Sequence, residues 1–153
     1  MLNVYRCLLL AGVVVVMGGC AVSSPDSMPV EPMTASVELE DSPAMALLQR
    51  AESARQQGQG AAAERYLERA LNIAPDSSWL YRELADLRLS EGDARGAEGF
   101  ALKALRLAPD HDDYQASLWE MVATARDRQG DRDGARDARS RAAALRNPVA
   151  RPV

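Results

Sequence analysis

The sequence predicts an all-α protein built from three helix-turn-helix units, and three observations support this. Residues 58–75 and 92–109 repeat one another with a period of 34 residues. Alanine is abundant and β-branched residues are few beyond position 40, which favours helices packed through small side chains over a sheet. Both cysteines, Cys7 and Cys20, precede the repeats, so the fold must be stabilised by packing and not by disulfides.

The N-terminus has the pattern of a secretory signal. Arg6 precedes an apolar run at residues 7–17, and Gly18-Gly19-Cys20 follows. The run is too short to cross a bilayer, which takes about 20 apolar residues. We expect a signal peptide over residues 1–19 that is cleaved from the mature protein.

Residues 17–20 resemble the lipobox of bacterial lipoproteins, with Met17 where leucine is usual. The resemblance implies that a lipid is attached to Cys20 and anchors the protein to a membrane. Stable attachment takes two or more acyl chains. Ala21 follows the cysteine in place of the aspartate that retains such proteins in the inner membrane, which implies the outer membrane, facing the periplasm. The alternative is an ordinary secretory signal with a chance cysteine.

Residues 20–42 are expected to form a disordered tether. Beyond Cys20 this segment has three prolines, five serines and five acids and no sustained helical or strand period. As a random coil it would span roughly 25 to 30 Å.

The repeated residues each suit a helix-turn-helix unit. Glycine ends the first helix in a left-handed conformation, alanines let two helices approach closely, and proline stops the second helix. The pairs separated by 34 residues are Gly58 and Gly92, Ala63 and Ala97, Leu67 and Ala101, Ala70 and Ala104, and Pro75 and Pro109.

A third unit follows at an offset of 38 residues, at Gly130, Ala135 and Ala142, with four residues inserted around 111–116. Asp93 and Asp131 follow the turn glycines and are expected to cap the next helices. We place the repeat domain at 43–147 and a tail at 148–153. The expected helices span 44–57, 60–74, 78–91, 94–108, 114–129 and 132–146.

This period and its small residues resemble the tetratricopeptide repeat (TPR). The resemblance implies a short right-handed solenoid, in which Tyr81 and Trp119 take the place of the large packing aromatic. It also implies that the first helices of the units line a partner-binding groove. Mapped onto this sequence, the groove residues are Met45, Leu48, Glu52, Trp79, Arg82, Asp86, Leu89, Glu120, Thr124 and Asp127.

Trp79 is the main candidate in this groove. It lies two positions before Tyr81, so it should face the groove and not the interior, and an aromatic beside an arginine is typical of an interface hot spot. The alternative is that Trp79 packs on the preceding helix as part of the junction between repeats. Trp119 is expected in the core.

The last helix carries an excess of arginine. Arg132, Arg136 and Arg139 form either a basic patch for an acidic partner or the wettable end that a terminal repeat needs.

The sequence predicts no enzyme, cofactor, metal or small-molecule substrate. The mature chain has one histidine, His111, in an acidic loop that we expect to cap the next helix instead of binding a cation. Net charge is −4 with interspersed basic residues, which argues against nucleic-acid binding.

A short outer-membrane lipoprotein with a Pro/Ser-rich tether and a small TPR domain resembles the TPR-containing type of Lpo activators of class A penicillin-binding proteins, although the tether is short. The resemblance implies an adaptor that binds and stimulates a peptidoglycan synthase. The alternatives are a pilotin-like assembly factor for a pilus or secretion pore and a peptidoglycan-binding structural lipoprotein.

Overall fold

The computed structural model describes residue 34 and residues 38–147. The predicted signal peptide, the lipidation site at Cys20, most of the tether and the tail at 148–153 lie outside the described residues. No helix in the described part is long and apolar enough to cross a membrane.

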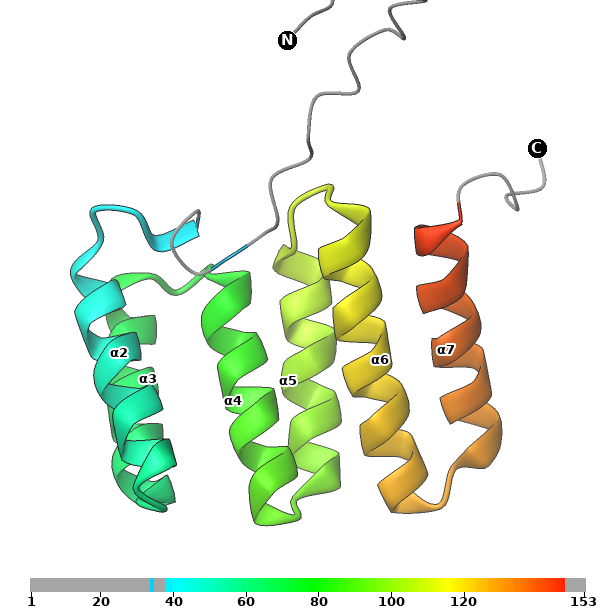
Figure 1. The fold of residues 1–153 in the computed structure, drawn as a ribbon, viewed down its shortest axis with the longest axis horizontal. Helices are drawn as coiled ribbons and strands as arrows, with labels where there is room; N and C mark the ends of the chain where they lie inside the picture. Colours follow the sequence, from blue (N-terminus) through cyan, green and yellow to red (C-terminus); the bar gives the residue numbers. More distant parts are fainter. Residues whose placement is uncertain (1–33, 35–37, 148–153) are drawn as a thin grey trace, which may run out of the picture. The chain divides into compact units, whose positions relative to one another are not determined.

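Six helices occupy the described part of the chain, which contains no strand (Figure 1). The all-α prediction is therefore confirmed, and every helix begins and ends within two residues of its expected limits. The helices are α2 (Pro43–Gln56), α3 (Gly60–Ile73), α4 (Ser78–Glu91), α5 (Ala94–Leu107), α6 (Asp112–Gln129) and α7 (Arg132–Arg146).

The turns within the units follow the predicted chemistry. Gly92 and Gly130 end α4 and α6 with φ of 84° and 83°, a left-handed conformation that glycine adopts without steric cost. Asp93 and Asp131 then cap α5 and α7, since each carboxylate accepts a hydrogen bond from a backbone N–H three residues on. These contacts confirm the predicted caps.

The inserted residues of the third unit lengthen its first helix. α6 has 18 residues where α2 and α4 have 14. It starts at Asp112, two residues earlier than expected, because His111 caps it: the Tyr114 N–H donates to His111 Nδ1 at 3.3 Å. The predicted capping role of this loop is confirmed, and the described residues include no group of three or more side chains suited to a metal ion.

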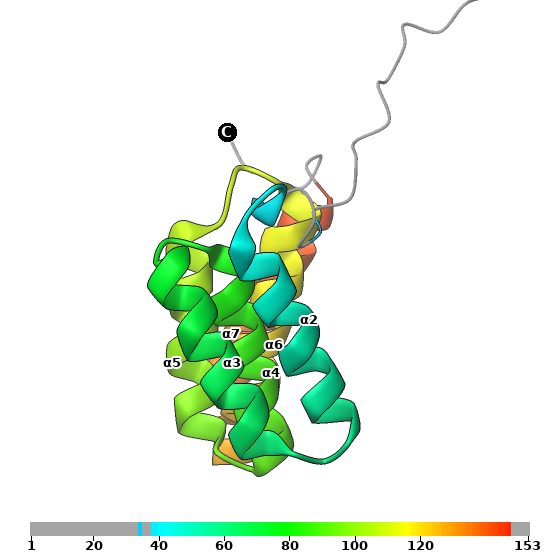
Figure 2. The same ribbon diagram turned by 90° about the vertical axis from the view of Figure 1, so that its left-hand side faces the viewer.

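The helices form two layers, with α2, α4 and α6 on one side and α3, α5 and α7 on the other (Figure 2). We call the surface formed by α2, α4 and α6 the first-helix face. Alanines sit where the layers meet: Ala70, Ala97, Ala104, Ala135 and Ala142 are fully buried. The absence of a bulky side chain at these positions lets the paired helices pack closely.

The packed domain begins before the boundary that we placed at residue 43. Leu39 is 2 % exposed and belongs to the core formed by α2, α3 and α4. Glu38 accepts hydrogen bonds at the start of α4. The last residues assigned to the tether are therefore part of the fold, because a leucine and a carboxylate find partners that composition alone does not reveal.

Candidate functional site

The candidate site starts at the first turn of α4. Ser77 caps this helix by accepting a hydrogen bond from the Leu80 N–H at 3.1 Å. The Glu38 carboxylate accepts one from the Trp79 N–H, with its two oxygens at 3.0 and 3.2 Å, and another from the Ser77 hydroxyl. Backbone donors of the helix start are thus satisfied, and the carboxylate lies at the positive end of the helix dipole. These bonds fix the start of α4, the helix that carries Trp79.

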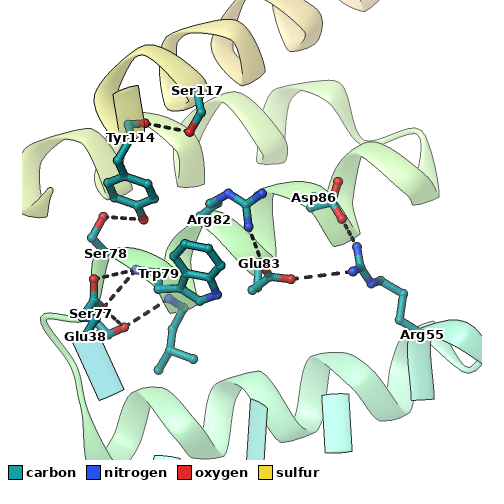
Figure 3. A network of polar contacts seen from close by, with 11 residues as sticks. Glu38, Arg55, Ser77, Ser78, Trp79, Arg82, Glu83, Asp86, Tyr114 and Ser117 are labelled. Atoms are coloured by element: carbon teal, nitrogen blue, oxygen red, sulfur yellow. Dashed lines mark hydrogen bonds and ion pairs between the residues drawn. The ribbon is translucent and has the colours of Figure 1, made fainter. Parts of the chain in front are cut away.

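Trp79 lies between the second and third units (Figure 3). Its ring stacks on Tyr114 of α6 with centroids 5.7 Å apart and planes 9° apart. The guanidinium of Arg82 lies 4.6 Å from the ring centroid. Stacking and cation–π contact both restrain the indole, so it forms a rigid aromatic element on the first-helix face.

A buried serine hydroxyl holds the side chain of Tyr114 in place. Its OH lies 2.9 Å from Ser78 Oγ, which donates to the Ala104 carbonyl at 3.0 Å. Burial raises the pKa of Tyr114 to about 12, and the hydrogen bond with Ser78 partly opposes this shift. The phenol therefore remains neutral over the physiological range and serves to position Trp79.

A row of charges continues from Trp79 along the same face. Arg82 donates to Glu83 at 2.6 Å, Arg55 of α2 lies 3.8 Å from the other oxygen of Glu83, and Arg55 also pairs with Asp86 (Figure 3). Glu83 is only 7 % exposed. Burial raises its pKa, although Arg82 and Arg55 counteract the effect by attracting the carboxylate. These ion pairs thus link the first unit to the second, and the side chains that form them range from buried to exposed.

The structure brings together only part of the predicted groove. Trp79, Arg82 and Asp86 share one face of α4, as expected. Leu48 and Leu89, 1 % and 9 % exposed, are buried, so the exposure predicted for them is wrong. Leu48 belongs to the core of the first unit, and Leu89 packs with two alanines of α5 and α6.

The other predicted groove residues lie nearer the two ends of the face. Met45 is partly buried against the first core. Glu120 pairs with Arg146 of α7 at 3.0 Å, and the Thr124 hydroxyl donates to the Glu120 carbonyl at 2.9 Å. Among the described residues, no hydrogen bond, ion pair or ring contact joins these side chains to Trp79.

Trp79 is half-buried and packs against two core clusters. The expectation that it avoids the interior is therefore wrong in part, and the alternative, junction packing, describes much of its surface. Its Nε1–H is buried without an acceptor in the described part of the chain. Trp79 therefore contributes to the packing between units and also forms part of the first-helix face.

The arginines of the last helix are largely neutralised by acids. Arg136 pairs with Asp133 and Arg139 with Asp127, while Arg132 is exposed at the start of α7. Trp119 is half-buried against the core and has the Arg141 guanidinium 4.8 Å from its ring centroid. These pairs fit a wettable solenoid end better than a patch of free positive charge.

Sequence reasoning missed Glu38, Arg55, Glu83 and Tyr114. Glu83 was detectable, because positions 79, 83 and 86 recur at helical spacing and share one face. Tyr114 and Glu38 contact Trp79 from other segments, through spacings of 35 and 41 residues that no local pattern encodes.

The comparisons with known proteins agree with this fold and identify the family. A family model for the tetratricopeptide repeat matches residues 54–118. The globular C-terminal domain of P. aeruginosa LpoP is 40 % identical, with a TM-score of 0.64; the match covers 66 % of this chain and 95 % of that domain. The chain belongs to the LpoP family of TPR proteins.

A second solved structure shares the fold alone. The N-terminal domain of stress-induced protein-1 (STI-1) from C. elegans is 19 % identical with a TM-score of 0.64, over 69 % of this chain and 87 % of that one. No curated protein sequence gives a significant match. All buried residues of the described part lie between Leu39 and Ala142.

Proposed function

We propose that this protein is a non-catalytic adaptor that binds a class A penicillin-binding protein in the periplasm and stimulates its synthesis of peptidoglycan. The observation that carries the proposal is the 40 % identity to LpoP over almost all of the LpoP domain. The predicted lipobox, Pro/Ser-rich tether and TPR domain agree with it, since this is the architecture of the TPR-containing Lpo activators. A repeat domain of this kind acts by presenting a surface and not by catalysis.

We assign partner binding to the first-helix face around Trp79. Aromatic and arginine side chains dominate interface energetics when they are rigid and partly desolvated. Trp79 is restrained by Tyr114 on one side and Arg82 on another, so little side-chain entropy remains to be lost on binding. The neighbouring row of charges adds polar specificity to this surface.

The direct test is a reconstituted polymerisation assay. The chain from residue 21 is added to a class A penicillin-binding protein of the same bacterium with its lipid-linked substrate, and glycan synthesis is followed over time. A saturable increase in rate is the expected result. An unchanged rate together with no complex on a sizing column would overturn the proposal, and capture of a secretin or of bare peptidoglycan would favour the assembly or wall-binding alternative.

The membrane anchor is the second element of the proposal. We propose that Cys20 carries the lipid and holds the protein in the outer membrane. Because only the thiol can accept the diacylglycerol, Cys20→Ala should leave the precursor unprocessed or release a soluble form, whereas Cys7→Ala should not. Normal maturation and membrane attachment of Cys20→Ala would contradict the anchor.

A further inference from the structure

The outer side of the second layer carries several unpaired basic residues. On α3 and α5, the side chains that point away from the buried alanines are exposed or half-buried, and five of them are cations. None of the five forms an ion pair with a described residue, and Asp76 and Asp110, in the turns after these helices, pair with none of them. We call this surface the basic face; its cations are Arg65, Arg69, Arg95, Lys103 and Arg106.

The acids of the same two helices do not balance these cations. Glu64 is held by Arg88 of α4, and Glu98 is held by Arg126 of α6 at 2.7 Å. Glu68 is therefore the one carboxylate of α3 and α5 that has no ion pair within the described segments. Five cations stand against this single carboxylate, in a chain whose net charge is −4.

The equivalent side of α7 has a different composition. Asp133 stands where the 38-residue offset places Arg95, and it pairs with Arg136. Asp137 pairs with Arg141 at 2.9 Å. On this side of the layer, unpaired positive charge thus belongs to the first two units. The tether precedes α2, so these are also the units nearest to it.

Beside the basic face lies the one large hydrophobic side chain that is exposed in the described part of the chain. Ile73 is 47 % exposed. It ends α3, four residues after Arg69 and eight after Arg65, so the three side chains form one row along the helix. Such a row suits a membrane surface, where lipid phosphates attract the cations and an aliphatic side chain enters the interface.

A sugar polymer fits this surface less well. The other exposed residues among the cations offer a single side-chain amide for hydrogen bonds to sugar hydroxyls; they are Ala61, Glu68, Asn72 and Gly99. The cations are also spread over two helices and do not converge on a pocket. Charge that is spread in this way matches the spread negative charge of a lipid surface.

We propose that the basic face docks on an anionic phospholipid membrane. Its arginines contact lipid phosphates, and Ile73 enters the interface between headgroups and acyl chains. Because α2, α4 and α6 form the opposite layer, docking directs the first-helix face away from the membrane and leaves it open to a partner (Figure 2). The inference rests on the proposed function in one respect, namely that a lipid on Cys20 keeps the domain close to such a surface.

The test is co-sedimentation of the chain from residue 21 with unilamellar vesicles at low salt. Phosphatidylglycerol vesicles should bind the chain saturably, with an affinity that falls as sodium chloride is added, and phosphatidylcholine vesicles should bind it at least about tenfold more weakly. No binding to phosphatidylglycerol, or equal binding to both lipids, would overturn the proposal. So would stronger binding to purified peptidoglycan sacculi at the same concentration of negative charge, which would assign the face to a wall polymer.

A double variant of α3 has a matched control on α7. Arg65→Gln with Arg69→Gln should weaken binding to phosphatidylglycerol vesicles by about tenfold or more, since each arginine near an anionic surface accounts for about fivefold in affinity. Arg136→Gln with Arg139→Gln removes the same charge from arginines that are paired with acids, and it should bind within about twofold of wild type. Equal losses in the two double variants would show that net charge alone drives binding and would overturn the proposal.

Ile73 tests the apolar part of the contact. Ile73→Ser should weaken binding to phosphatidylglycerol vesicles by about threefold or more, and Ile73→Leu should retain it, because only the serine loses the aliphatic surface. Circular dichroism checks that both variants are folded. Wild-type binding by folded Ile73→Ser would contradict the proposal.

Stimulation of the synthase in detergent solution, without vesicles, separates this inference from the proposed function. The Arg65→Gln, Arg69→Gln variant should stimulate polymerisation as wild type does. Loss of stimulation there would mean that the basic face contacts the synthase itself, and it would overturn this inference. Vesicle binding as described, with no stimulation by the wild type, would instead contradict the proposed function and support the docking surface.

Discussion

The domain contains two tryptophan–arginine pairs with almost the same geometry and different surroundings. Arg82 lies 4.6 Å from the Trp79 ring, and Arg141 lies 4.8 Å from the Trp119 ring. In the first pair, Trp79 also stacks on Tyr114 of the next unit. In the second pair, Trp119 and Arg141 lie on the two helices of one unit. Equivalent contacts therefore stabilise a junction between units at one site and a helix pair at the other.

The acids that accompany the two arginines differ in burial. The side chain of Glu83, the partner of Arg82, is 8 % exposed, while that of Asp137, the partner of Arg141, is 54 % exposed. A charge pair in a partly dry surface is strong and sensitive to loss of either member, but an exposed pair is screened by water and salt. The comparison teaches that the environment of the contact, more than its geometry, distinguishes a candidate binding surface from a solvated end.

The largest stability effect is expected at Trp79. Trp79→Ala removes contacts with two core clusters and the stack on Tyr114, and it should lower the free energy of unfolding by about 2 to 4 kcal/mol. Trp119→Ala removes contacts with one cluster and should cost about 1 to 2 kcal/mol. Urea unfolding followed by circular dichroism measures both. Equal losses would mean that the two sites do not differ as described.

Alkaline pH should weaken the Trp79 junction selectively. The pKa of Tyr114 is raised from 10.0 to about 12, so the folded state holds a proton that the unfolded state releases first. The corresponding stabilisation is complete below pH 10 and is lost as the pH rises through 12; by pH 11 the loss is about 1 kcal/mol. Urea unfolding at pH 8 and pH 11 should show this loss in the wild type and a smaller one in Tyr114→Phe. Identical pH dependence in both proteins would contradict the assignment.

The smallest effect is expected at the arginine-rich end. Arg139 pairs with Asp127 through a side chain that is 48 % exposed, so Arg139→Ala should change stability by less than about 0.5 kcal/mol. Partner binding should also be retained by the Arg136→Ala, Arg139→Ala double variant. Loss of the partner in that variant, with an intact fold, would move the binding site to α7.

The sequence predicted the helices well because their signals are local. The 34-residue period, the turn glycines Gly92 and Gly130, and the capping aspartates each act within a few residues of where they occur. The 38-residue offset likewise revealed the longer α6, although its first turn depends on the cap by His111.

The site was harder to predict because neither the burial of a side chain nor its contacts with distant segments have a local signature in the sequence. Helical phase placed Leu48 and Leu89 on the same side as Trp79, but other helices cover both leucines. Glu38 reaches α4 from a segment whose composition indicated a tether. Trp79 itself was found by its register relative to Tyr81, while its partial burial depends on Tyr114 in the next unit.

The most direct test of the central claim is the affinity of a class A penicillin-binding protein for Trp79→Ala and for Trp119→Ala. Circular dichroism at the assay temperature must show that both variants are folded. We predict that Trp79→Ala weakens the complex by about thirtyfold or more and reduces stimulation of polymerisation, while Trp119→Ala binds within about twofold of wild type. Wild-type affinity of folded Trp79→Ala, or an equal loss in both variants, would contradict binding through the first-helix face.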